Sequence, residues 1–283
     1  MTSSQGSAGR WSDLDRPPLN APALRHALVL PDGLWTSLDV VESTGSTNTD
    51  LAARADALPE GAVLVAEEQT SGRGRLDRAW TAPARSGLFL SVLLKPDVPV
   101  HRWGWLPLLT GVAAATGLSK AAGADLTLKW PNDLLVRVAG EERKTGGILA
   151  ERAGADGVVV GLGLNVSLRP DELPVPAAGS LLLADAVSTD RDTLLRAVLR
   201  SLEQWYGAWV RAGGDPAASG LLAAYEERCA TLGRRVRAEL PGERKLEGEA
   251  VGVDGDGRLV VATEGGGTEA VAAGDIVHLR AAG

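Results

Sequence analysis

The stretch from Gln69 to Trp80, which reads QTSGRGRLDRAW, has the residue types needed to close over an anionic ligand. Two glycines and three arginines are interleaved in it: Gly72, Arg73, Gly74, Arg75 and Arg78. The glycines let the backbone bend and bring its N–H groups close to oxyanions, and the guanidinium groups match phosphate or carboxylate. Trp80 adds a flat surface for a heterocycle. The same composition, taken alone, also fits a mobile basic surface loop.

Two lysines downstream stand out because lysine is rare in this chain. Of its 29 basic residues, only Lys95, Lys120, Lys129, Lys144 and Lys245 are lysines, and the rest are arginines. Lys129 begins the segment KWPND, and Lys144 begins the segment KTGGILAE. Unlike a guanidinium, a compact ammonium can sit beside a reacting carboxylate as a point charge. The alternative is a pair of ordinary surface lysines, which is what we expect of the other three.

Five motifs together resemble the biotin–protein ligase family, in its short form without an N-terminal DNA-binding domain. They are Ser46-Thr47-Asn48, Gln69 to Trp80, Lys129 to Asp133, Lys144 to Leu149 and Gly161 to Asn165, in the family's order. Any one of them could arise by chance, but five in order at compatible spacing could not. The resemblance covers most of residues 40–166 and continues more weakly to the C-terminus.

The resemblance implies an ATP-dependent ligase that works in two steps with Mg²⁺. The biotin carboxylate attacks the α-phosphate of ATP, giving biotinyl-5′-AMP and pyrophosphate. A specific lysine of a biotin carboxyl carrier domain, in an enzyme of the acyl-CoA carboxylase type, then takes the biotin and releases AMP. The first step needs no general base because the carboxylate is already ionised, but it does need positive charge against the triphosphate.

By carry-over from the family, the catalytic residues are Lys144, Arg73 and Asp133. Lys144 is expected beside the biotin carboxylate and the α-phosphate. Freeing the acceptor amine from its proton costs about 4–5 kcal/mol at neutral pH, so Asp133 is the candidate that accepts this proton or orients the amine. The alternative for Asp133 is a cap on the turn after Pro131, and for Lys129 a supporting partner of Asp133.

The resemblance also assigns the ligand contacts. For biotin they are Ser46, Thr47, Asn48, Gln69, Gly72, Arg73, Gly74, Arg75, Lys144, Gly147 and Gly163. For ATP they are Arg73, Arg75, Arg78, Trp80, Lys129, Asn132 and Asn165, with no metal site formed by protein ligands alone. Strand glycines such as Gly147 and Gly163 suit close approach of a ligand. Asp77 and Thr145 depart from the family's pattern, and either could alter how the arginine–glycine loop closes.

The elements expected to position these residues form an α+β fold, with a mixed β-sheet of the biotin/lipoate ligase (class II synthetase-like) type. Strands are expected up to Val41 and over residues 62–66, 87–94, 126–129, 145–151 and 158–166. Helices are expected over residues 21–30, 49–57, 103–122 and 190–212. Thr47 or Asn48 would cap the second helix, and Trp130 is expected in the core.

Three regions are predicted: a disordered tail over residues 1–22, a catalytic domain over 23–229 and a C-terminal domain over 230–283. In the last, short strands over residues 236–240, 246–253, 259–262 and 276–279 alternate with turns at 241–242 and 254–257. This alternation suggests a small barrel, and the family has an SH3-like β-barrel in this place. Gly265 to Gly267 read as a turn because no helix follows.

Composition excludes several classes of protein. The chain has 283 residues and a net charge of −7, which argues against broad nucleic-acid affinity. Cys229 is the single cysteine, so no internal disulfide forms, and a reducing cytoplasm is expected. The first residues look like neither a signal peptide nor a membrane span, and fewer than forty precede the catalytic region. We therefore expect no DNA partner, no membrane partner, and a monomer or weak homodimer.

Two other functions stay open at this point. A lipoate or octanoate ligase would share the chemistry, although the arginine–glycine loop together with KWPND favours biotin. A non-catalytic binding module would hold its ligand without releasing pyrophosphate. We also expect the arginine–glycine loop to be disordered in the free protein and ordered by ligand, because its like charges repel one another.

Overall fold

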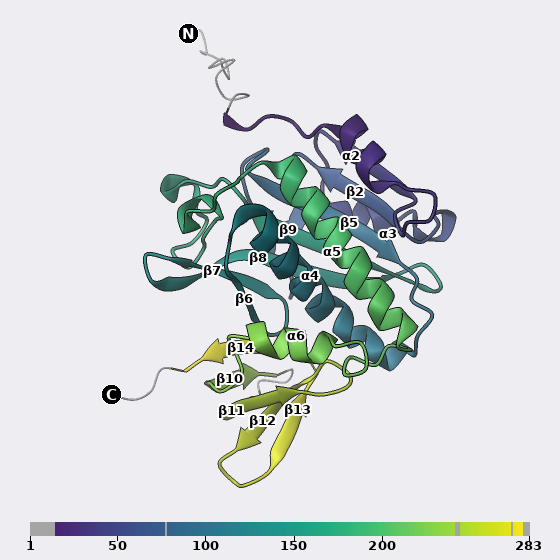
Figure 1. Ribbon diagram of the computed structural model, residues 1–283. Coiled ribbons are helices and arrows are strands. Elements are labelled where there is room, and N and C mark those ends of the chain that lie inside the picture. Colours follow the sequence, from purple (N-terminus) through teal and green to yellow (C-terminus); the bar gives the residue numbers. More distant parts are fainter. Residues whose placement is uncertain (1–14, 77, 241–243, 273, 280–283) are drawn as a thin grey trace.

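The computed structural model describes residues 15–76, 78–240, 244–272 and 274–279. Asp77 and the predicted turn at residues 241–242 lie outside the described residues, as do residues 1–14 of the expected tail. The described chain forms one large mixed sheet with helices on both faces and a smaller antiparallel sheet that follows it (Figure 1).

The large sheet has seven strands in the order β1-β2-β5-β9-β8-β7-β6. Their bounds are β1 Ser37–Val41, β2 Ala62–Ala66, β5 Gly87–Leu94, β9 Gly157–Asn165, β8 Glu141–Ala153, β7 Asp133–Val138 and β6 Leu126–Lys129. β1 and β2 are parallel, and every other neighbouring pair is antiparallel. The predicted mixed sheet is therefore confirmed. β7, the strand that joins β6 to β8, was not predicted from the sequence.

Two long helices cover one face of this sheet. α4 (Trp105–Ala122) and α5 (Arg191–Arg211) lie side by side across it, as Figure 1 shows, with α2 (Ala21–Leu28) and α6 (Leu221–Arg228) at either end. Because strand side chains alternate, Val160 and Leu162 of β9 belong to the main core with these helices, while Val159 points to the other face. That second face packs against α3 (Thr47–Ala52) in a smaller apolar cluster.

Short 3₁₀ helices complete the catalytic domain. They are η1 Ala55–Ala57, η2 Val100–Gly104, η3 Pro170–Glu172 and η4 Leu182–Ala184. Two of them modify predicted helices: η2 precedes α4, and η1 follows α3, so the helix expected over residues 49–57 is divided into two pieces. No described helix is long and apolar enough to span a bilayer.

The start of α3 differs from the expected cap. The helix begins at Thr47, its N-cap is Ser46, and the Ser46 side chain makes no capping hydrogen bond. Thr47 and Asn48 are instead buried inside the helix's first turn, where their side chains bond to neighbouring strands and to Gln69. The predicted cap at Thr47 or Asn48 was wrong because both side chains bond to residues distant in the sequence.

The end of the predicted tail also needs correction. Leu19 is buried, and Arg16 donates hydrogen bonds to the hydroxyl (3.2 Å) and carbonyl (2.9 Å) oxygens of Ser167. Asn20 caps α2 by accepting a hydrogen bond from the Ala23 N–H at 3.1 Å. Residues 15–22 are thus packed on the catalytic domain, through partners so distant in sequence that local composition gives no sign of them.

The C-terminal sheet has five antiparallel strands in the order β13-β12-β11-β10-β14. They are β10 Arg235–Glu239, β11 Lys245–Val253, β12 Leu259–Thr263, β13 Thr268–Val271 and β14 Asp275–His278. Within the described part of the chain, no pairing joins the edge strands β13 and β14, so an antiparallel sheet is confirmed but a closed barrel is not. Gly266, with a φ of +83°, lies in the β12–β13 turn, as predicted for residues 265–267.

Candidate active site

Strand register gathers the predicted site residues into one row across the large sheet. Lys129 of β6 pairs with Asp133 of β7, which pairs with Gly147 of β8, which pairs in turn with Gly163 of β9. The row continues through Phe89 of β5. Directly paired residues share a face of a sheet, so all of these lie on the face that α3 covers.

A β-bulge brings Lys144 to the same face. Leu134 pairs with Gly146 and Leu135 pairs with Lys144, so Thr145 is the extra residue in β8. Without the bulge, Lys144 and Gly147 would point to opposite faces, because they are three residues apart. The Thr145 side chain is fully buried and donates a hydrogen bond to the Asn165 carbonyl at 3.1 Å. Thr145, which departs from the family's pattern, is therefore the buried bulge residue that turns Lys144 toward the site.

Glycines form the floor of the site, and two side chains lie directly on it. A Cβ at position 163 would be 2.8 Å from the Trp80 ring, and a Cβ at position 161 would be 2.1 Å from Asn48 Oδ1. The sequence analysis explained these strand glycines by ligand approach. In the structure the close approach is made by Trp80 and Asn48.

Polar groups are concentrated at the α3 end of the site. Gln69 Oε1 accepts hydrogen bonds from the Thr47 N–H (2.8 Å) and the Thr47 hydroxyl (3.1 Å). The Ser91 hydroxyl lies 2.7 Å from Thr47 Oγ1 and 2.6 Å from Asn48 Oδ1. These buried groups fix one another's orientation, so the end of the site is a rigid set of donors and acceptors.

The opposite end of the site carries cations around the Asp133 carboxylate. Lys144 Nζ lies 2.6 Å from Asp133 Oδ1. Burial lowers the pKa of Lys129, and the nearby Lys144 and Arg78 add to this while Asp133 opposes it. Burial is also the main cause that lowers the pKa of Arg75. Three partly desolvated cations facing one carboxylate leave a net positive field, which suits a polyphosphate.

The arginine–glycine loop leans over this floor as a short hairpin. Its strands are β3 (Gly72–Arg73) and β4 (Ala79–Trp80). Arg73 pairs with Glu151 of β8 at 3.0 Å, and Glu151 also accepts a hydrogen bond from Asn48 at 2.9 Å. Arg75 contacts the Asn132 side chain at 3.4 Å. The predicted ordering of the loop by ligand stays a prediction.

A cavity of about 350 Å³ joins the two ends. Most predicted residues line it: Ser46, Thr47, Asn48, Gln69, Arg73, Gly74, Arg75, Arg78, Trp80, Lys129, Asn132, Asp133, Lys144, Gly147 and Gly163. Two are not among the described residues that line it. Gly72 is paired with Trp80 in the loop's hairpin and faces the Trp80 carbonyl. Buried Asn165 donates a hydrogen bond to the Gly179 carbonyl at 3.0 Å.

Sequence reasoning missed two kinds of cavity residue. The first is apolar and comes from the sheet: Leu90, Ile148, Leu149 and Leu162. The second comes from the C-terminal sheet: Glu239, Ile276 and Val277. Strand alternation could have revealed Leu149, which shares the α3 face with its partner Gly161, whereas Leu90, Ile148 and Leu162 belong to the core on the other face. No local signal marks the second kind, because it depends on how the two sheets dock. No described cluster of three or more His, Cys, Asp or Glu residues could hold a metal.

The C-terminal domain holds the KWPND segment in place. The Thr231 hydroxyl accepts a hydrogen bond from the Trp130 N–H at 3.1 Å, and the Trp130 indole donates to the Gly257 carbonyl at 3.0 Å. Trp130 is buried, as predicted. His278 Nε2 lies 3.2 Å from the same Thr231 hydroxyl, and His278 Nδ1 lies 3.2 Å from Arg234.

The pKa of His278 is lowered to about 4, first by burial and then by Lys129 and Arg234, with Glu142 opposing them. The unfolded chain therefore binds more protons than the folded one between about pH 6.5 and 4, and acid favours unfolding. Solvent screening of this partly exposed ring limits the loss to about 1–2 kcal/mol. Urea unfolding near pH 7 and near pH 5 should show a smaller loss for His278→Gln than for the wild type. Equal losses would contradict the assignment.

A rigid polar end, a glycine floor and a cationic end form a site that can hold an anionic ligand among positive charges. The chain belongs to the biotin/lipoate A/B protein ligase family, which matches residues 40–165. Residues 231–279 match the biotin protein ligase C-terminal domain.

Individual relatives agree with this family. The chain is 45% identical to a biotin--[acetyl-CoA-carboxylase] ligase of Mycobacterium tuberculosis, over 94% of this chain and 97% of that protein. It is 34% identical to the bifunctional ligase/repressor BirA of Bacillus subtilis, over 81% of this chain and 69% of that protein. Among solved structures, a biotin protein ligase from Aquifex aeolicus in complex with biotin and ATP has a TM-score of 0.70 and 27% identity. The match covers 87% of this chain and 100% of that one.

Proposed function

We propose that this protein joins biotin to ATP, forming biotinyl-5′-AMP, and transfers the biotin to a lysine of a biotin carboxyl carrier domain. The observation that carries the proposal is the row from Lys129 to Gly163, with cations at one end and the Thr47–Gln69 donors and acceptors beyond the other. The acceptor would belong to an acyl-CoA carboxylase, as the name of the Mycobacterium tuberculosis relative indicates for that protein.

In the first step, a biotin carboxylate oxygen forms a bond to the α-phosphorus, and the bond from that phosphorus to the bridging oxygen breaks as pyrophosphate leaves. Lys144 lies where a carboxylate resting on Gly147 would meet it, since a Cβ at position 147 would be 3.5 Å from Lys144 Nζ. Bringing two anions together is the main barrier, and a fixed ammonium between them lowers it. Arg73, Arg75 and Lys129 would neutralise the remaining phosphate charge.

In the second step, the acceptor amine attacks the mixed anhydride carbonyl carbon, the bond to AMP breaks, and the nitrogen loses a proton. Asp133 is the carboxylate closest to Lys144, at 2.6 Å, and it would accept this proton or orient the amine. Once Lys144 turns toward the acyl phosphate, Asp133 is released to act. One carboxylate thus serves the two steps in succession.

Other parts of the proposal rest on the composition of the site. We propose that Mg²⁺ enters on the ATP phosphates, because the Asp133 carboxylate in the cavity is already paired with Lys144. We also propose an SH3-like arrangement of the C-terminal strands, a cytoplasmic location and a monomer or weak homodimer. The buried free thiol of Cys229 agrees with a reducing compartment.

The decisive test is exchange of labelled pyrophosphate into ATP, with biotin and with lipoate in parallel. We expect exchange with biotin alone, because the hydrogen-bonding end at Thr47 and Gln69 suits a ureido ring better than a dithiolane. Exchange with lipoate alone would assign the protein to the lipoate ligases of this family. Biotin binding without any exchange would identify a binding module.

A further inference from the structure

A buried carboxylate outside the cavity lies at the base of the arginine–glycine loop. Glu67 directly follows β2, and its side chain is only 3% exposed. One carboxylate oxygen accepts a hydrogen bond from the Leu19 N–H at 2.6 Å, and the other pairs with Arg191 of α5 at 2.6 Å. Arg191 is itself 6% exposed. Both charges are thus removed from water, which is tolerated only when each is fully matched.

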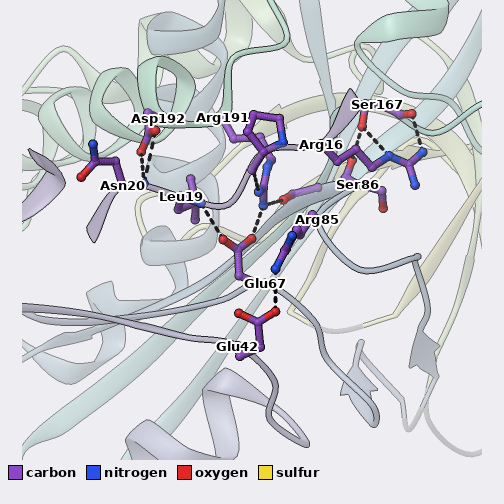
Figure 2. A network of polar contacts seen from close by, with 12 residues as sticks. Arg16, Leu19, Asn20, Glu42, Glu67, Arg85, Ser86, Ser167, Arg191 and Asp192 are labelled. Atoms are coloured by element: carbon purple, nitrogen blue, oxygen red, sulfur yellow. Dashed lines mark hydrogen bonds and ion pairs between the residues drawn. The ribbon is translucent and has the colours of Figure 1, made fainter. Parts of the chain in front are cut away.

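The partners of this pair come largely from residues 15–20, which we call the N-terminal strap. Figure 2 shows the strap running past Glu67 and Arg191, with its own anchors on either side. Arg191 donates a second hydrogen bond to the Pro17 carbonyl at 2.6 Å. Arg16 bonds to Ser167 and pairs with Glu172, and the Asn20 N–H donates to Asp192 at 3.1 Å. None of the described residues of the strap lines the cavity.

The backbone of Glu67 closes the loop that covers the cavity. Its N–H donates to the Val41 carbonyl at 2.9 Å, and its carbonyl accepts from the Arg85 N–H at 2.8 Å. The whole arginine–glycine segment lies between Glu67 and Arg85, so this single hydrogen bond joins the loop's two ends. Gln69, which bonds to Thr47, follows two residues later. Glu67 cannot shift without moving the loop's base.

We propose that the N-terminal strap and the Glu67–Arg191 pair are positioning elements for the substrate loop. By fixing Glu67, they set where Gln69 and the loop arginines stand relative to a bound ligand. An apolar contact would hold Glu67 in place without fixing its orientation. The charged pair fixes the orientation as well, because only one orientation of the Glu67 carboxylate satisfies both Leu19 and Arg191. The identity of the ligand as biotin rests on the proposed function, whereas the mechanical link does not.

Two variants of the full-length chain test the link. Glu67→Gln keeps the shape but removes the charge opposite Arg191, and Arg16→Ala releases the strap without touching the pair. Arg237→Ala is the matched control, because it removes an exposed pair with Glu247 in the C-terminal sheet that involves no strap residue. We expect the Kd for biotin to rise about tenfold in Glu67→Gln and about threefold in Arg16→Ala.

Amide hydrogen–deuterium exchange gives a readout that needs no ligand. We expect faster exchange over residues 69–80 in both variants and wild-type exchange over β9, with no change in Arg237→Ala. Lower thermal stability with wild-type loop exchange and wild-type biotin affinity would overturn the proposal and leave the network a purely stabilising one. If the wild-type protein fails to use biotin at all, the proposed function fails, and the loop's exchange still decides the role of the strap.

Discussion

Lys144→Ala is expected to lower biotin-dependent pyrophosphate exchange about 10²–10³-fold while weakening biotin binding far less. The ammonium pairs with Asp133 at 2.6 Å and is brought to the site by the bulge at Thr145. In the ground state it contacts one end of the ligand only. In the transition state it faces both the carboxylate and the α-phosphate, so most of its contribution appears there.

The measurement compares exchange rates with biotin affinities from calorimetry. Lys95→Ala is a suitable control, because Lys95 pairs with Asp156 at 3.5 Å and does not line the cavity. It should change neither quantity. Equal losses of exchange and of binding in Lys144→Ala would mean that Lys144 is a binding contact and has no special role in the chemical step.

Gly161→Ala is the second large expected effect, although it adds a single methyl group. The new Cβ would stand 2.1 Å from Asn48 Oδ1. Asn48 is buried and bonds to Ser91, Glu151 and the Leu149 carbonyl, so it has no open space into which it can move. Leaving such groups unsatisfied costs about 1–3 kcal/mol each, which corresponds to a roughly 10–100-fold loss of biotin affinity.

Gly252→Ala provides the control, because a Cβ at position 252 has nothing within 4 Å. Calorimetry with biotin and thermal unfolding of both variants would separate the site from general stability. We expect Gly161→Ala to lose affinity and Gly252→Ala to behave as wild type. Wild-type affinity in Gly161→Ala would show that α3 can retreat from the sheet and that the glycine floor is not required.

Much of the fold could be predicted because apolar runs report burial directly. The strands over Ala62–Ala66 and Gly87–Leu94 have the predicted bounds, since each is a continuous buried run between turn signals. β7 was missed because it directly follows the KWPND turn and has no separate start signal. The helix expected at residues 49–57 begins earlier, at Thr47, and the Thr47 and Asn48 side chains bond to Gln69 and to a distant strand instead of capping it.

The site was predictable where its residues lie in the five motifs, including uncharged ones such as Thr47 and Gln69. Lys144, Asp133 and the loop arginines meet at the cavity as expected, and the motifs identified them by type and spacing. The bulge that orients Lys144 could not be foreseen, because register depends on a partner strand. Glu239 and the strap contacts could not be predicted from the sequence either, since they arise from segments that meet only when the chain is folded.

The bulge at Thr145 makes chain length a stricter requirement in β8 than residue type. Exchanging Lys129 or Asp133 in the row from Lys129 to Phe89 alters one side chain and leaves the strand register unchanged. Gaining or losing one residue between Lys144 and Gly147 would turn one of them to the opposite face of the sheet. The Lys144 ammonium and Gly147 would then no longer lie on the same side. β8 can therefore tolerate some substitutions, whereas a single insertion or deletion between Lys144 and Gly147 would separate the site residues.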